Sequence, residues 1–113
     1  EAPHLREPYM DLALLLYRWE DWDGVLYFTG CALAIRNRPR TYICEAASWG
    51  SLPYDLRAIA LHHTGRAAEA AEVARRAAEL EPSSQRLRDN AKLLENLAKK
   101  AAKETADPPF TGI

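Results

Sequence analysis

Residues 51–84 have the sequence SLPYDLRAIALHHTGRAAEAAEVARRAAELEPSS, and this stretch decides the fold. It predicts two antiparallel helices, over residues 53–64 and 67–80, joined by a tight turn at Gly65. The first helix opens with a proline, which the first helical turn tolerates because that N–H has no partner there. The second helix ends at Leu80, before Glu81-Pro82, since proline cannot continue the ladder of helical hydrogen bonds. The stretch therefore predicts a helical hairpin.

Three alanines of the second helix, Ala70, Ala74 and Ala77, share one helix face and would allow a neighbouring helix to approach closely. The stretch resembles a tetratricopeptide repeat, a helical hairpin of about 34 residues with the pattern W-x2-L-G-x2-Y…A-x3-F…P. In this sequence the Trp, Gly, Tyr, Ala and Pro positions and a late small position are taken by Tyr54, Ala58, Leu61, Ala70, Pro82 and Ala77. Two positions depart from the pattern, because Arg57 replaces the Leu and Ala74 replaces the Phe.

A second copy of the pattern lies 45 residues upstream. Its helices are predicted over residues 8–19 and 22–35, around a turn at Glu20-Asp21. Tyr9, Leu12, Ala13, Leu16 and Ala32 align with Tyr54, Arg57, Ala58, Leu61 and Ala77. This copy is degenerate, with Val25, Thr29 and Asn37 at the Ala, Phe and Pro positions. Leu12, Leu15 or Leu16, and Trp19 are expected on one side of the first helix, with Trp19 in the core between the helices.

The last helix is predicted over residues 84–103, capped by Ser83 or Ser84. Its apolar stripe comprises Leu87, Ala91, Leu94, Ala98 and Ala101, widened by Leu93 and Leu97. Lys92 would stand at the small-residue position of a third repeat, so this helix is interpreted as a capping helix that covers the last apolar face. The fold class is therefore all-α: two tetratricopeptide-like units, about residues 6–39 and 51–84, plus a capping helix, forming a short α-solenoid. Residues 1–106 would make one domain and 107–113 a flexible tail.

An insertion, RTYICEAASWG at residues 40–50, separates the two units. Tyr42, Ile43 and Trp49 are too apolar for a solvated linker, so we expect the segment to fold back onto the helices. Burial of Trp49 in the core and contact of Trp49 with a ligand are both compatible with its position.

Residues 49–55, WGSLPYD, and the opening residues 3–8, PHLREP, resemble a domain that follows the catalytic domain in some bacterial and phage family 2 glycosyltransferases. Asp21-Trp22 matches the turn of that group, whereas Leu5 replaces an arginine of its opening. The resemblance covers about residues 2–90 and implies a neighbouring transferase domain in a parent protein. It places no catalytic residue in this chain. Asp21-Trp22-Asp23 has the letters of a D-x-D metal site but falls at a turn between helices, not at a strand end.

Composition limits the function further. The chain has 113 residues, 48% hydrophobic content and a net charge of −1, which suits one small globular domain without long-range attraction to nucleic acid or anionic membranes. The sequence contains no run of about 18 apolar residues, which a membrane-spanning helix would need. We expect a cytoplasmic protein, with neither nucleic acid nor a membrane as partner. Because the first residue is Glu1, we expect a fragment or a processed product. Cys31 and Cys44 could form a disulfide or remain reduced.

Sequence patterns for catalysis or metal binding are weak, and no cofactor is expected. His62 and His63 point about 100° apart on a helix and cannot both face one ion, and no further ligand completes a set with His4. Arg36, Arg38 and Arg40 are interpreted as a helix end that complements the dipole rather than as a phosphate site. We therefore expect no enzymatic activity from this chain.

The repeat resemblance implies a binding groove lined by the first helix of each unit. The candidate groove residues are Met10, Leu14, Tyr17, Arg18, Asp55, Ile59, His62, His63, Arg86 and Asp89, with Tyr42 and Trp49 added from the insertion. Leu14 and Ile59 stand where a clamp for a terminal carboxylate would need charged or amide groups.

Three functions remain open on this basis. The first is a scaffold that binds a protein or peptide partner, or an attached glycosyltransferase domain. The second is an accessory domain that binds a glycan or glycoprotein acceptor, which exposed rings at Tyr42 and Trp49 would favour. The third is self-association through apolar surface at Leu93 and Leu97.

Overall fold

The computed structural model describes residues 5–36 and 46–106. Helices account for most of these residues, and the described part of the chain contains no strand. The helices are α1 (Glu7–Arg18), α2 (Trp22–Ala34), α3 (Ala46–Trp49), α4 (Leu52–His63), α5 (Ala67–Leu80) and α6 (Gln85–Ala106). The protein is therefore all-α, as the sequence predicts, and the predicted span 67–80 coincides with α5.

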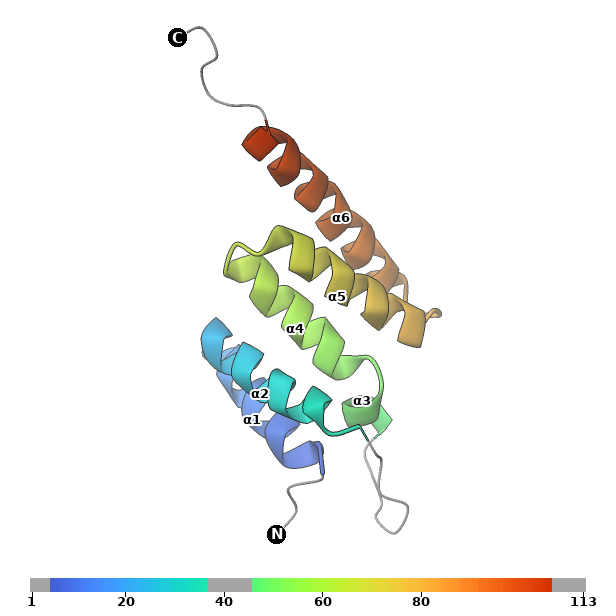
Figure 1. Ribbon diagram of the computed structural model, residues 1–113. Helices are drawn as coiled ribbons and strands as arrows, with labels where there is room; N and C mark the ends of the chain where they lie inside the picture. Colours follow the sequence, from blue (N-terminus) through green and yellow to red (C-terminus); the bar gives the residue numbers. More distant parts are fainter. Residues whose placement is uncertain (1–4, 37–45, 107–113) are drawn as a thin grey trace, which may run out of the picture.

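The five longer helices are stacked one on the next in chain order (Figure 1). The main packing contacts join α1 to α2, α2 to α4, α4 to α5, and α5 to α6. α1–α2 and α4–α5 are antiparallel hairpins, and α6 covers the open side of the second hairpin (Figure 1). This arrangement is the predicted short array of helical repeats with a last helix at its end.

The two hairpin turns have the same backbone structure at positions that differ by 45. The Asp21 N–H donates to the Leu16 carbonyl at 2.9 Å, and the Arg66 N–H donates to the Leu61 carbonyl at 2.9 Å. Such a six-to-one hydrogen bond defines a Schellman motif, which requires a left-handed residue just before the donor. Glu20 (φ 58°) and Gly65 (φ 79°) supply that residue. The internal repeat is therefore visible in the backbone as well as in the sequence.

Burial follows the same offset. Four pairs of equivalent residues are buried in both hairpins: Ala13 and Ala58, Val25 and Ala70, Thr29 and Ala74, Ala32 and Ala77. Most of these side chains are small, which lets the paired helices approach closely. The close packing of each hairpin thus depends on the same positions.

Two apolar clusters form the core, and α4 belongs to both. Leu56 and Ala60 contribute to the first cluster, with Met10 and Val25 from α1 and α2. Ala58 and Leu61, on another side of α4, contribute to the second, with the alanines of α5 and Leu94 of α6. Because α4 contributes residues to both clusters, it joins the core of the first hairpin to the core of the second.

A polar contact joins the two hairpins where the repeat pattern is broken. Arg57, half-buried on α4, donates through Nη1 to the Leu26 carbonyl at 2.8 Å and to the Thr29 hydroxyl oxygen at 3.2 Å. Thr29 is fully buried, and its hydroxyl donates to the Val25 carbonyl at 2.7 Å. Arg57 and Thr29 stand in the Leu and Phe positions of the repeat pattern. Two departures from the pattern therefore contact each other.

The prediction that Trp19 lies in the core is wrong. Its side chain is 69% exposed, and Leu12 and Leu15 of the same helix are also exposed. Within the described residues, α1 packs mainly against α2 and less against α4. The leucine-rich sequence of α1 supplies apolar residues to more of its circumference than these neighbours cover.

The insertion contains a short helix that the sequence does not predict, and the C-terminal helix is slightly longer than its predicted span. The described part of the insertion forms the short helix α3, which packs against α4. α6 ends three residues later than predicted, and Ser84 Oγ accepts from the Leu87 N–H at 3.3 Å as its cap. Leu87 and Leu94, which belong to α6, are buried. Tyr42, Cys44 and the predicted tail 107–113 lie outside the described residues.

Among the helices that are described, none has the length and apolarity needed to cross a bilayer.

Candidate functional site

A shallow pocket of about 120 Å³ lies between α4 and α6. Two of the predicted groove residues, Ile59 and His62, line it from α4. Asn90, Leu93 and Leu94 line it from α6, and Leu93 is 56% exposed. These three residues are not among the predicted groove residues, although their spacing on the helix indicates that they share a face with Arg86. The pocket thus has apolar walls with one imidazole and one amide.

Two further predicted groove residues, Asp55 and Arg86, bind each other. Arg86 Nη2 lies 2.6 Å from Asp55 Oδ2, and Nη1 lies 3.3 Å from Oδ1. The Asp55 side chain is only 12% exposed, whereas that of Arg86 is 60% exposed. The hydrogen bond to Asp55 raises the pKa of Arg86. This bidentate pair fastens α6 to the first turn of α4, so the charge of Arg86 is already compensated within the protein.

The histidines of α4 have different surroundings, as their spacing predicts. The His63 ring stacks on Trp22 with centroids 4.2 Å apart and planes 5° apart. Tyr17, another predicted groove residue, contacts the Trp22 ring edge-on, and the two ring centroids are 5.7 Å apart. His63 and Tyr17 therefore belong to an aromatic contact between the hairpins. His62 lines the α4–α6 pocket instead.

The remaining groove predictions on the main helices have separate positions. Met10 is a correction: it is 1% exposed and belongs to the first core cluster, because α1 turns this face toward α2 and α4. Leu14 is half-buried and packs against the same cluster. Arg18 is exposed at the end of α1. Asp89 accepts a hydrogen bond from Gln85 Nε2 at 2.7 Å on the exposed side of α6.

Trp49 fastens α3 to the start of α1. Its Nε1 donates to Glu7 Oε2 at 3.0 Å, and the Arg6 guanidinium carbon lies 4.4 Å from its ring centroid. Arg6 is buried, and its Nε donates to the Ile35 carbonyl at 2.7 Å while Nη1 donates to the Ser48 carbonyl at 3.3 Å. Burial lowers the pKa of Arg6. Sequence reasoning missed Arg6, since nothing in a lead-in segment marks one arginine as buried.

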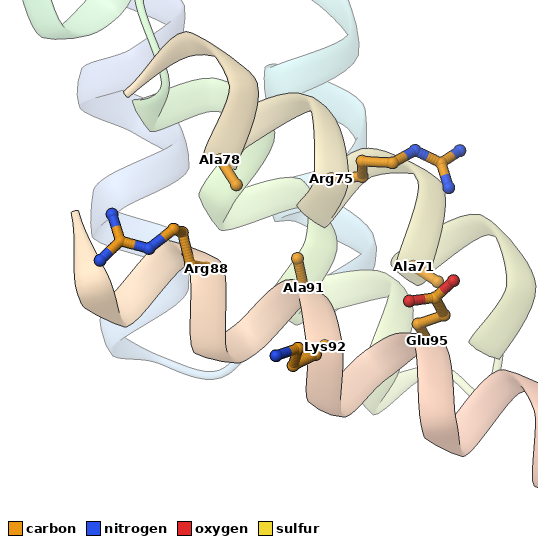
Figure 2. Close-up of a pocket in the computed structure, with 7 residues that line it drawn as sticks. All are labelled: Ala71, Arg75, Ala78, Arg88, Ala91, Lys92 and Glu95. Atoms are coloured by element: carbon orange, nitrogen blue, oxygen red, sulfur yellow. The ribbon is translucent and has the colours of Figure 1, made fainter. Parts of the chain in front are cut away.

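A second pocket, of about 230 Å³, lies between α5 and α6 (Figure 2). Three alanines from the two helices line it, and four charged side chains project around them (Figure 2). The lining residues are Ala71, Arg75, Ala78, Arg88, Ala91, Lys92 and Glu95. Arg88 also donates to the Pro82 carbonyl and to Gln85 Oε1 at the start of α6. The pocket is therefore an alanine-lined groove with three cations and one carboxylate, and it was absent from the predicted site.

No group of three or more His, Cys, Asp or Glu side chains in the described ranges is placed to hold a metal ion. Asp21, the first residue of the D-x-D string, accepts from the Gly24 N–H at 3.1 Å as the cap of α2. Its carboxylate thus has a structural role at the turn.

Comparison with protein-family models, curated proteins and solved structures found no match to this chain.

Proposed function

We propose that this chain is a non-catalytic, tetratricopeptide-like interaction module whose α4–α6 pocket binds an apolar side chain of a protein or peptide partner. The observation that carries this proposal is the pocket itself. It brings Ile59 and His62 from one unit together with Leu93 from the capping helix. Repeat proteins bind ligands on surfaces that neighbouring units build together, and the formation of this pocket by two packed elements supports the proposal.

The size and polarity of the pocket favour a peptide over a small molecule. Sites for drug-sized ligands generally have volumes of roughly 300–1,000 Å³, whereas this pocket has about 120 Å³. It has room for one apolar side chain. Asn90 can both donate to and accept from a peptide backbone beside that side chain.

The resemblance of residues 49–55 to a segment of glycosyltransferase-associated domains supports a narrower version of the proposal. In that version the partner is a glycosyltransferase domain, attached or separate, and the complex forms in the cytoplasm. The competing function, binding of a glycan or glycoprotein acceptor, would use the ring of Trp49. The Nε1 of that ring is hydrogen-bonded to Glu7 and the Arg6 guanidinium lies over the ring, which favours the scaffold.

A peptide selection followed by NMR tests the proposal. Random peptides would be selected on the wild-type protein and counter-selected on Leu93→Asn. Leu80→Asn is the matched control, because Leu80 is also an exposed leucine but lies on α5 and does not line the pocket. The selected peptide should shift the amide signals of Ile59, His62 and Asn90 in wild type and Leu80→Asn but not in Leu93→Asn.

A panel of sugars provides the contrasting measurement. Shifts around Trp49 on addition of a sugar, with none in the α4–α6 pocket on addition of any selected peptide, would replace the scaffold by the acceptor-binding function. A selection that yields no peptide dependent on Leu93 would contradict the pocket as the binding site.

A further inference from the structure

The two ends of the helical array carry opposite charge. The described segment 5–36, which contains α1 and α2, has five carboxylate residues and three arginines, a formal charge of −2. α6, at the other end, contains six lysines and arginines and three carboxylate residues, a formal charge of +3. The net charge of −1 for the whole chain conceals this asymmetry. Opposite charges on two surfaces favour their encounter and fix their orientation.

The acidic end also exposes large apolar side chains. Trp19 is 69% exposed and Tyr27 is 66% exposed, and Leu12 and Leu15 are exposed on the same helix as Trp19. Asp11 is exposed one residue before Leu12. Single exposed apolar residues are ordinary, whereas several on one helix face indicate an interaction surface.

The opposite end offers a complementary groove. The α5–α6 groove is lined by Ala71, Ala78 and Ala91, with Arg75, Arg88 and Lys92 projecting around it (Figure 2). Within the protein, the alanine stripe of α5 already lets another helix, α4, approach closely. The groove also has the carboxylate of Glu95 at its border, so its three cations leave a net positive charge there. An alanine-lined groove with this border fits a helix that carries a carboxylate beside its apolar face.

We propose that α1 of one molecule docks in the α5–α6 groove of a second molecule of the same chain. Leu15 and Trp19 would cover the alanines, and Asp11 would lie against Arg75 or Lys92. α1 and α6 stand at opposite ends of the stack (Figure 1), so a molecule cannot fill its own groove with its own α1. The contact is head-to-tail, and each added molecule presents a free surface for the next. The proposed contact does not depend on the function proposed above.

Sedimentation velocity of the full chain over a range of concentrations tests the contact. At about 0.1 M NaCl the average mass should rise with concentration above the monomer mass of 12.7 kDa. It should fall toward that mass at about 1 M NaCl, where the Debye length shortens from about 10 Å to about 3 Å. A constant monomer mass at millimolar concentration in low salt would overturn the proposal.

Variants blocked at one end separate a head-to-tail contact from other modes of association. Arg75→Glu/Lys92→Glu removes the positive charge of the groove, and Asp11→Lys/Trp19→Ser alters the opposing helix; all four side chains are exposed. Each variant alone should be monomeric, with the apparent Kd weakened by about tenfold or more. An equimolar mixture should form a dimer that does not grow, because it combines one intact groove with one intact α1.

Lys99→Glu/Lys103→Glu is the matched control, since it changes the net charge of the chain by the same amount at residues outside the groove. It should assemble like wild type. Loss of assembly in this control would show a general charge effect and would contradict a defined groove. Association of either blocked variant with itself, or a mixture that remains monomeric, would also overturn the head-to-tail contact.

Discussion

Glu20 and Gly65 occupy the same position in two copies of one turn. Of the two, only the glycine readily adopts the left-handed backbone conformation that the turn requires. Both residues have positive φ, 58° for Glu20 and 79° for Gly65. The left-handed conformation costs a residue with a Cβ roughly 1 kcal/mol, and glycine does not bear this cost. No atom lies within 4 Å of a Cβ built on Gly65, so backbone conformation alone distinguishes the two sites.

Exchanging the residue types at these turns should change stability in opposite directions. We expect Glu20→Gly to raise the free energy of unfolding by up to about 1 kcal/mol and Gly65→Ala to lower it by about 1 kcal/mol. Urea unfolding measures both changes. Glu20→Ala is the control, because it removes the exposed carboxylate while keeping the Cβ. An increase as large in Glu20→Ala as in Glu20→Gly would assign the effect to charge instead of backbone.

The Arg57–Thr29 contact should behave as a coupled pair. Arg57→Met removes a charge-assisted hydrogen bond to the Leu26 carbonyl and the contact with the Thr29 hydroxyl, so we expect a loss of about 1–3 kcal/mol in the free energy of unfolding. Thr29→Val should cost about 1 kcal/mol by the same measurement. In the double variant the two losses should be non-additive by about 0.5 kcal/mol or more. Strict additivity would mean that the two side chains act independently.

Residue by residue, the sequence predicts what local geometry determines and misses what distant partners determine. The turn at Gly65 and the different surroundings of His62 and His63 follow from local rules, and the structure has both. The sequence marks Arg57 as a departure from the repeat pattern but does not identify its partners, which lie 28 or more residues away. Arg6 could not be found at all for the same reason.

Among the elements, α3 has several of its contacts through a single side chain, Arg6. Arg6 connects it to the end of α2 through the Ser48 and Ile35 carbonyls and lies over the Trp49 ring. A planar guanidinium can donate in two directions and stack at once, which an ammonium group cannot do. The short helix depends on such tertiary contacts, including its packing against α4, since four residues do not form a stable helix alone.

Replacing Arg6 should therefore release α3 without unfolding the array. We expect both Arg6→Ala and Arg6→Lys to lower the free energy of unfolding, by about 2 kcal/mol, and to expose Trp49 to solvent. Acrylamide quenching of Trp49, in a background where Trp19 and Trp22 are replaced by Phe, measures the exposure. The same background with Arg6 retained is the reference. Full protection of Trp49 in Arg6→Lys would show that charge alone is sufficient.

Sequence prediction at the scale of elements depends on clear punctuation. α5 was predicted to the residue because Gly65-Arg66 precedes it and Glu81-Pro82 follows it. α3 was predicted only as a segment that folds back, since four residues show no period. Trp19 was placed on the wrong side of α1 because periodicity identifies apolar positions but does not show which of them meet a neighbour.

For the whole molecule, the unequal lengths of the last two helices set where unfolding begins. α6 has 22 residues and α5 has 14, so their lengths are about 33 Å and about 21 Å at 1.5 Å per residue. The final turns of α6 therefore extend beyond α5 (Figure 1), and residues 99–104 are exposed. α4, in contrast, contributes to both core clusters.

Native-state hydrogen exchange should reflect this arrangement. Amides of residues 99–106 should exchange with little protection, whereas those of Leu61 and neighbouring α4 residues should exchange only on global unfolding. Leu94→Ala, which opens the second cluster, should increase exchange throughout α6 and α5 more than in α1 and α2. Equal increases in all helices would mean that the array unfolds as one unit.

The contact between Arg57 and Thr29 also makes the order of the two repeats matter. A gene duplication that placed a copy of the second unit after the original would set the new arginine against Ala74, which has no hydroxyl group. A duplication of the first unit would set Leu12 of the new copy against Thr29 of the original, so that this threonine would face no arginine. In the existing order, the arginine of the second unit meets the threonine of the first. Keeping this contact throughout a longer array of repeats would therefore require a matched change at positions 29 and 57 or their equivalents.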